Sequence, residues 1–162
     1  MLRNLVRFVR DKRGTAAIEF GAIGGLLAMT TVPLVDVGRL AHLYMQTNYG
    51  VEAATLYAAK NGFDASAISA VVQSATSSNV VVANPSPYMF CGCPSAAGVK
   101  ESFKTDSPSS CGTDPSDNNS TCDGGAKPNA YVNVQAQASF SPLFDALPYP
   151  RTIYAAAKVR VQ

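Results

Sequence analysis

A long apolar run near the N-terminus limits the folds that are open to this chain. Residues 14–35 read GTAAIEFGAIGGLLAMTTVPLV, which is 22 residues with a single charged side chain, Glu19. As an α-helix, a run of this length spans about 33 Å, close to the roughly 30 Å hydrocarbon core of a bilayer. A cleaved secretory signal would end at a small-x-small site in a non-helical segment, and a buried core helix is the other alternative. Because the helical pattern continues without a break, the sequence predicts a transmembrane helix over residues 15–35.

Charge is distributed unevenly on the two sides of this run. The net charge is +2, but residues 1–13 carry five Lys or Arg against one Asp, a net charge of +4, which leaves −2 for residues 14–162. Basic flanks stay on the cytoplasmic side of a membrane. We therefore expect residues 1–14 to be a cytoplasmic basic leader in a single-pass, N-in and C-out topology. Nucleic acid is not an expected partner, because binding it requires a basic face on the folded body.

The helical pattern continues through residues 36–62. Apolar residues recur at three- and four-residue spacing from Val37 to Ala58, which is typical of an amphipathic helix. Asn61-Gly62 supplies a stop, because both residues tolerate the left-handed conformation. Pro33 removes one helix hydrogen bond, and we expect a kink there. The sequence predicts one helix of more than 45 residues, whose second part extends outside the membrane.

Residues 63–162 change period and form the predicted head. Asp64 is placed to cap a short helix over residues 65–74. Residues 131–140 and 151–162 alternate apolar and polar side chains, and residues 79–83 are β-branched. Such segments are typical of antiparallel strands with one face in water. The predicted fold class is α+β, with the long helix packed on a small antiparallel sheet. Residues 84–130, rich in Pro, Ser, Gly, Asn and Asp, are predicted to be a long loop.

All four cysteines fall within that loop region: Cys91, Cys93, Cys111 and Cys122. An even count beyond a membrane anchor predicts two disulfides in an oxidising compartment. A bridge between the first two cysteines would close a very tight ring. We therefore expect each of them to bridge to one of the last two, with both of those pairings open.

The sequence gives little support for a metal site or for catalytic activity. The cysteine spacing does not match the C-x2-C pairs of structural zinc sites. Oxygen ligands in residues 114–123 lack the glycine and terminal glutamate of an EF-hand, so we expect a solvated acidic turn rather than a calcium site. The single histidine, His42, has no nucleophile at a suggestive spacing, and the common nucleotide, hydrolase and zinc-protease motifs are missing. We expect no cofactor, no metal and no catalytic activity. The candidate oxygen ligands are Asp114, Asp117, Asn118, Asn119 and Asp123.

One local motif is not explained by a membrane anchor alone. A basic pair precedes Gly14, and Glu19-Phe20 follows inside the apolar run. An ionised glutamate in hydrocarbon costs about 2.5–3.5 kcal/mol on insertion scales. In one interpretation Glu19 lies at the interface and snorkels. In the other, cleavage after Gly14 frees the amine of Thr15, which then pairs with Glu19 of a neighbouring subunit.

This pattern resembles the processing site of type IV pilins and pseudopilins. The closer resemblance is to the TadE/TadG-like family of the tight-adherence (Flp) pilus system. It is carried by Arg13–Phe20 and by the exit segment Asp36-Val37-Gly38-Arg39, with a weaker likeness over residues 132–143 and 153–161. The larger TadG-type members carry a D-x-S-x-S metal motif. Residues 64–69 do not fit its spacing, so the TadE-like side is favoured.

The resemblance implies a pilin-like fold and a prepilin peptidase that cuts between Gly14 and Thr15. It implies a minor pilin or pseudopilin that takes part in pilus assembly or secretion across the envelope, and in surface adhesion. The implied partners are other pilin or pseudopilin subunits, the assembly machinery of the bacterial inner membrane, and membrane lipid. The head would then lie in the periplasm or on an extracellular pilus. The alternative is an unprocessed membrane-anchored envelope domain that binds a ligand or protein through the 84–130 loop.

Overall fold

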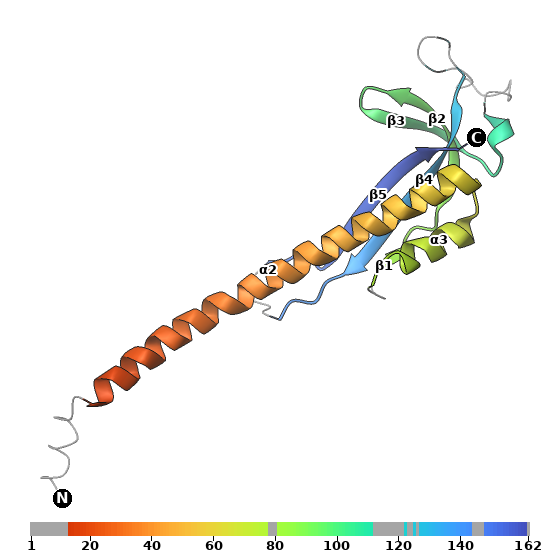
Figure 1. Ribbon diagram of the computed structural model, residues 1–162. Coiled ribbons are helices and arrows are strands. Elements are labelled where there is room, and N and C mark those ends of the chain that lie inside the picture. The colour runs from red at the N-terminus through yellow and green to blue at the C-terminus, as the bar shows by residue number, and fades with distance from the viewer. Residues whose placement is uncertain are drawn as a thin grey trace, which may run out of the picture. The chain divides into compact units, whose positions relative to one another are not determined.

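The fold was obtained as a computed structural model, which describes residues 13–77, 81–111, 122, 125, 127–143 and 148–161 (Figure 1). A long N-terminal helix, a short second helix and a small antiparallel sheet make up an α+β fold. The predicted leader lies outside the described residues except for its last two positions. The elements in chain order are α2 (Arg13–Asn61), α3 (Ala65–Ser74), β1 (Val81–Ala83), β2 (Tyr88–Ser95), β3 (Gly98–Lys104), the 3-10 turn η1 (Pro108–Ser110), β4 (Asn129–Ser139) and β5 (Thr152–Arg160).

The chain divides into two compact units. One comprises Met1–Arg39 with Pro142–Tyr149, and the other comprises Leu40–Ser141 with Pro150–Gln162. The first unit therefore holds the first half of α2 and a short C-terminal segment. The second unit holds the rest of α2, helix α3 and every strand of the described sheet.

The second unit has one hydrophobic core, formed where the helices cover a face of the sheet (Figure 1). Val51, Ala54 and Ala58 of α2 are buried at three- and four-residue spacing, as the sequence predicts. A Cβ at Gly50 would lie only 3.0 Å from the Val72 carbonyl oxygen of α3. Small residues thus let α2 lie close to its neighbours. The core also includes Ile68, Val72, Val81, Met89, Ala130, Val132, Val134, Ala136, Ala138, Ala155 and Val161.

Strand β4 is the centre of the sheet. Ala136 pairs with Ala83 of β1 on one side and with Ala155 of β5 on the other. Strand β2 follows β1 along the same edge of β4, and β3 pairs with the outer side of β2. Every one of these pairings is antiparallel. The predicted strands over residues 79–83, 131–140 and 151–162 correspond to β1, β4 and β5.

The prediction that residues 84–130 form one long loop is wrong. Strands β2 and β3 lie within this range and form an antiparallel hairpin. Met89, Phe90 and Cys91 are consecutive and all buried, so β2 is covered on both faces. A strand covered on both faces does not alternate in polarity, and periodicity does not reveal it. Strand β3 instead carries the exposed charges typical of a sheet edge.

The sequence predicts a sheet with one face in water, and the β2–β3 hairpin shows that part of this face is covered. A β-bulge interrupts the β2–β3 pairing between Cys91 and Gly92, and a Cβ at Gly92 would lie 2.9 Å from the Lys100 carbonyl oxygen. Across the sheet, the Lys158 ammonium donates to the Val99 carbonyl at 3.1 Å. The hairpin therefore covers part of the second face, where Phe90 stacks on Tyr131 with ring centroids 5.8 Å apart. Asn133, expected to face water, is 4% exposed.

Helix α3 begins as the sequence predicts. The Asp64 carboxylate accepts hydrogen bonds from the backbone N–H groups of Ser66 and Ala67, at 2.9 and 3.0 Å. The Ala67 N–H, followed by the Ser66 hydroxyl, lowers the pKa of Asp64 from its ordinary value. Gly62, with a φ of +84°, follows the last residue of α2 and donates its N–H to the Ala58 carbonyl.

Candidate functional site

The first half of α2 presents an unusually large apolar surface. Residues 14–32 are all exposed, including Ile18, Phe20 and Met29 at 74–80%. A soluble monomer rarely exposes contiguous apolar surface of this kind, because it is unfavourable in water. Among the described helices, α2 alone is long and apolar enough to cross a membrane, and none of its apolar window is buried. Its length and composition fit a membrane anchor or a signal sequence.

The residues of the predicted processing and assembly motif lie at the start of α2. Gly14 and Thr15 occupy the first turn, and a Cβ at Gly14 would have no neighbour within 4 Å. Glu19 lies four residues after Thr15, so the two side chains share one face of the helix. Phe20 is 80% exposed. The structure thus places all four residues together on an exposed helical segment.

Two threonines within the apolar run are satisfied by the helix itself. The Thr31 hydroxyl donates to the Leu27 carbonyl at 2.7 Å, and the Thr30 hydroxyl donates to the same carbonyl at 3.0 Å. Such bonds to the preceding turn cover the polarity of threonine in an apolar medium. Pro33 lies inside α2, and its own carbonyl accepts a hydrogen bond from the Tyr149 hydroxyl at 3.3 Å. The kink expected at Pro33 stays a prediction.

A buried carboxylate directly follows the apolar run. Asp36 is 0% exposed, and both of its oxygens accept the Leu143 N–H, at 3.0 and 2.9 Å. The Arg39 guanidinium donates to Asp36 Oδ1 at 3.2 Å. Burying a charge is costly unless it is paired and hydrogen-bonded, and these donors supply that compensation. Sequence reasoning noted Asp36 only as part of the exit segment. Its position, with Arg39 three residues later, was the available signal.

Two disulfides link strand β2 to cysteines that follow the β2–β3 hairpin in the sequence. Cys91 bridges to Cys111, and Cys93 bridges to Cys122. Each of the first two cysteines therefore bonds to one of the last two, as expected. With all four sulfurs in disulfides, the zinc alternative has no thiolates to use.

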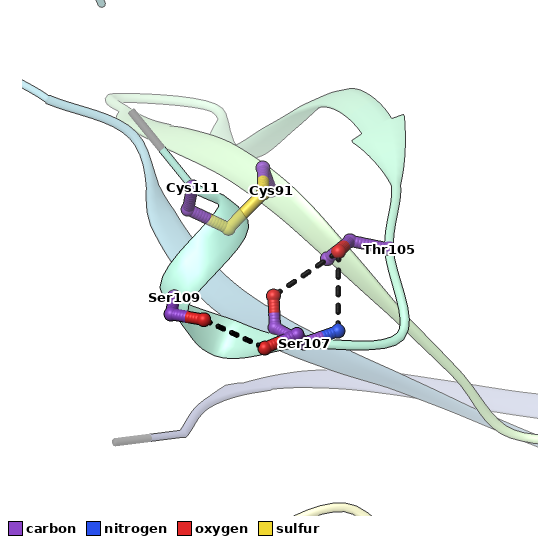
Figure 2. Close-up of a disulfide and its surroundings, with 5 residues drawn as sticks. All are labelled: Cys91, Thr105, Ser107, Ser109 and Cys111. Atoms are coloured by element: carbon purple, nitrogen blue, oxygen red, sulfur yellow. Dashed lines mark hydrogen bonds between the residues drawn. A yellow bond between two sulfur atoms is a disulfide. The ribbon is translucent and has the colours of Figure 1, made fainter. Parts of the chain in front are cut away.

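The turn beside the first disulfide is held by its own hydroxyl groups (Figure 2). The Ser107 N–H donates to Thr105 Oγ1 at 3.2 Å, and the Ser107 and Ser109 hydroxyls lie 2.8 Å apart. Thr105 in turn donates its N–H to the Met89 carbonyl of β2. The turn and the Cys91–Cys111 bridge thus attach the same segment to the same strand. The candidate oxygen ligands for calcium, Asp114, Asp117, Asn118, Asn119 and Asp123, lie outside the described residues.

A shallow groove of about 650 Å³ lies on the second unit, between α2 and the residues that follow α3. Its walls include Met45, Tyr49 and Leu56, each more than half exposed. The Gln46 amide nitrogen lies 2.7 Å from the Ser77 hydroxyl and 2.8 Å from His42 Nε2. His42 is thus held by a helix neighbour one turn away. Within the described ranges, no three His, Cys, Asp or Glu side chains gather where they would hold a metal ion.

A second cleft, of about 410 Å³, lies where the hairpin meets the second face of the sheet. Asn133 lines it and donates to the Tyr88 hydroxyl at 2.8 Å. The same hydroxyl donates to the Glu101 carboxylate at 3.1 Å. Burial raises the pKa of the Tyr88 phenol, and the adjacent Glu101 charge raises it further. These hydrogen bonds are internal to the fold, so they account for the buried polar groups of this face.

Comparison of the chain with family models, with curated proteins and with solved structures found no match. Function is therefore argued from the residues and their geometry.

Proposed function

We propose that this chain is a TadE-like minor pilin or pseudopilin of a tight-adherence pilus system, anchored in the inner membrane by the first half of α2. The observation that carries the proposal is the exposure of residues 14–32 in a helix whose later residues pack into a folded core. A signal sequence ends before the folded body begins. Here the helix runs without interruption to Asn61, which favours a retained anchor.

The anchor is also suited to packing against other helices. Its exposed small residues include Ala17, Gly21 and Gly25, and apart from the neighbouring backbone of α2 itself no atom of the described residues lies within 4 Å of a Cβ at either glycine. In lipid, small residues let neighbouring helices approach closely, because association there depends on van der Waals packing. The proposed neighbours are other pilin or pseudopilin subunits and the inner-membrane assembly machinery. The subunit takes part in pilus assembly or secretion, and in surface adhesion.

Processing by a prepilin peptidase gives Glu19 its partner. Cleavage after Gly14 makes Thr15 the first residue, with a protonated amine. Thr15 and Glu19 are separated by about 6 Å of helix rise, so a neighbour shifted by roughly one turn brings its amine to this carboxylate. The pair would neutralise a charge that is costly in hydrocarbon and would set the axial register between subunits.

The runner-up is an unprocessed envelope domain that binds a ligand through residues 84–130. A cleft of about 490 Å³ beside the first disulfide favours this reading, because two exposed cations, Lys127 and Arg160, line it. An anionic ligand would suit such a cleft. Processing separates the two proposals, since the runner-up keeps its leader.

The processing test is the intact mass of the protein from membranes, with and without a prepilin peptidase. We expect the peptidase to remove residues 1–14. Gly14→Leu should block the cut because the site would no longer accept the side chain, whereas Gly21→Leu, an equally exposed glycine two turns later, should be cut normally. Full-length mass in the presence of active peptidase would contradict the proposal.

The assembly test compares two glutamates of α2. Glu19→Gln should leave membrane insertion intact and abolish incorporation into the pilus or its assembly complex, because the amine of the neighbour loses its counter-charge. Glu52→Gln, in the part of α2 that belongs to the head, should be incorporated normally. Co-purification with the assembly complex measures both, and equal incorporation of the two variants would refute the charge pair.

A further inference from the structure

Two parts of the chain that are far apart in sequence meet at the end of the apolar run. Pro142, Leu143, Pro148 and Tyr149, which we call the strap, belong to the same compact unit as the first half of α2. The Leu143 N–H is bound by the Asp36 carboxylate, and the Tyr149 hydroxyl is bound by the Pro33 carbonyl. These two points lie three residues apart on α2, which is less than one helical turn. The strap is thus attached to one short stretch of the helix.

That stretch coincides with the expected boundary of the bilayer. The apolar run ends at Val35, between the two attachment points. A helix of its length crosses about 33 Å, so its last residues reach the level where hydrocarbon gives way to headgroups. If the first half of α2 spans the membrane, the strap lies at this level too.

The exposed chemistry of the strap suits a lipid interface. Leu143 is 66% exposed although its backbone is fixed, and Leu34 and Val37 on the adjacent helix are 71% and 50% exposed. An exposed leucine at the same level along the helix as exposed helical leucine and valine adds to the apolar surface of the anchor. Tyrosine is enriched at membrane interfaces, where its ring is in an apolar layer and its hydroxyl finds a polar partner. Tyr149 has such a partner in the Pro33 carbonyl.

Asp36 explains how a carboxylate is tolerated at this level. An unpaired charge near hydrocarbon is expensive. Here both carboxylate oxygens are occupied by the Leu143 N–H, Arg39 approaches Oδ1, and the side chain is fully buried. The hydrogen bonds that compensate the Asp36 charge also fix the Leu143 backbone, and the Leu143 side chain is exposed. Asp36 is therefore a positioning residue for the strap.

From this geometry we propose that the strap is a second membrane-contacting element, with Leu143 inserted among the lipids of the leaflet on the head side, at the same level along the helix as Leu34 and Val37. The partner is a lipid surface. The inference rests on the proposed membrane anchor and extends it from a single helix to a helix with an interfacial side contact.

The chain contains no tryptophan, so one introduced tryptophan reports its own surroundings. We would reconstitute full-length Leu143→Trp in phosphatidylcholine vesicles with and without bromine on the acyl chains, because bromine quenches nearby indole fluorescence. Emission should fall by about half in brominated vesicles, since interfacial elements insert about 5–10 Å into the headgroup–acyl boundary. Phe20→Trp, in the apolar run, and Tyr154→Trp, an exposed strand position of the head, are the references.

The three variants separate the possible outcomes. Quenching of Phe20→Trp and Leu143→Trp, without Tyr154→Trp, supports the inference. Quenching of Phe20→Trp alone would overturn it and leave the proposed anchor intact. Absence of quenching in all three would refute the anchor and the strap contact together. Quenching of all three would mean that the whole head lies on the bilayer, and the contact would not belong to the strap.

A second measurement tests the role of Asp36. In the Leu143→Trp background, Asp36→Ala should at least halve the fractional quenching, because the strap loses the acceptor that fixes its backbone. Asp64→Ala, which removes an acceptor from a helix cap in the head, is the matched control and should leave the quenching unchanged. Equal quenching in both double variants would overturn the assignment of Asp36 as the positioning residue.

Discussion

The two halves of helix α2 have similar residues and opposite surroundings. Both contain several Ala and Leu residues, but residues 14–32 are exposed, whereas Val51, Ala54 and Ala58 are 0–3% exposed in the core of the head. Glycine shows the same contrast. A Cβ at Gly50 would lie 3.0 Å from the Val72 carbonyl oxygen, whereas Gly25 has nothing that close. What differs is the arrangement: exposed apolar residues surround the first half, whereas the buried residues of the second half form one stripe.

Apolar content alone therefore does not determine whether a helix lies in a protein core or in another apolar environment. A single stripe indicates one covering partner, which here is the sheet and α3. An apolar surface on all sides needs an apolar environment on all sides. Matched substitutions in the two halves would therefore have unequal effects on the head.

The largest contrast is expected from a charge. Ala54→Asp puts a carboxylate where the structure offers 0% exposure, and an unpaired buried charge should cost more than about 4 kcal/mol, enough to unfold the head. Ala28→Asp, on the exposed half, should leave unfolding of the head unchanged in detergent. Circular dichroism during denaturant titration of the full chain measures both. Equal loss of stability would mean that the two halves are not energetically distinct.

Removing buried side-chain volume should give the next largest effect. Ile68→Ala in α3 should lower the free energy of unfolding by about 2–5 kcal/mol, because it leaves a cavity at a fully buried position. Ile18→Ala, at a position 74% exposed, should change it by less than about 0.5 kcal/mol. Denaturant midpoints supply the comparison. If Ile18→Ala lowered the free energy of unfolding of the head, the first half of α2 would have to be part of the same folded unit.

Removal of one disulfide should affect the head and leave the first half of α2 unchanged. The double substitution of Cys91 and Cys111 by Ala should cost about 2–4 kcal/mol, because the 20-residue separation is no longer closed in the unfolded chain. Faster amide exchange is expected around the Ser107 turn and not in residues 14–32, as mass spectrometry of exchanged fragments would show. Faster exchange throughout the anchor would contradict the independence of the two units.

The smallest effect is expected from pH. The lowered pKa of Asp64 means that its ionised form stabilises the folded head above the ordinary pKa of about 3.9, and that this stability is lost as pH falls through the lowered value. Asp64→Asn keeps a capping acceptor without the charge. The wild type should therefore exceed this variant in stability at about pH 7 and lose that advantage near pH 3. If the wild type were more stable than Asp64→Asn by the same amount at both pH values, the charge would not be what stabilises α3.

Local pattern was sufficient for much of the fold. Period and capping predicted α2, α3, β4 and β5, since each of these elements has a single covered face or a recognisable start. The β2–β3 hairpin was missed because burial of Met89, Phe90 and Cys91 comes from distant partners rather than from alternation. For the cysteines, ring size limited the pairings to two, and the choice between them depended on where η1 lies relative to β2.

The residues of the candidate site also fall into those that local sequence reveals and those that it does not. Gly14, Thr15, Glu19 and Phe20 were recognisable because their spacing is local, and their roles in processing and assembly stay predictions. The hydrogen bonds between Asp36 and Leu143 join residues 107 positions apart. No local pattern reports a contact across that separation, so the strap emerged only from the three-dimensional arrangement.

The central place of β4 has a consequence for how the chain is made. Strands β1, β2 and β5 all pair with residues of Asn129–Ser139, so only the β2–β3 hairpin can form before that stretch leaves the ribosome. By then more than 90 residues separate β4 from the apolar run, at translation rates of roughly 5–20 residues per second. If the first half of α2 is the proposed membrane anchor, its insertion thus has several seconds in which no competing folded head exists. The order of the elements along the chain matches the order in which a membrane-anchored subunit must be built.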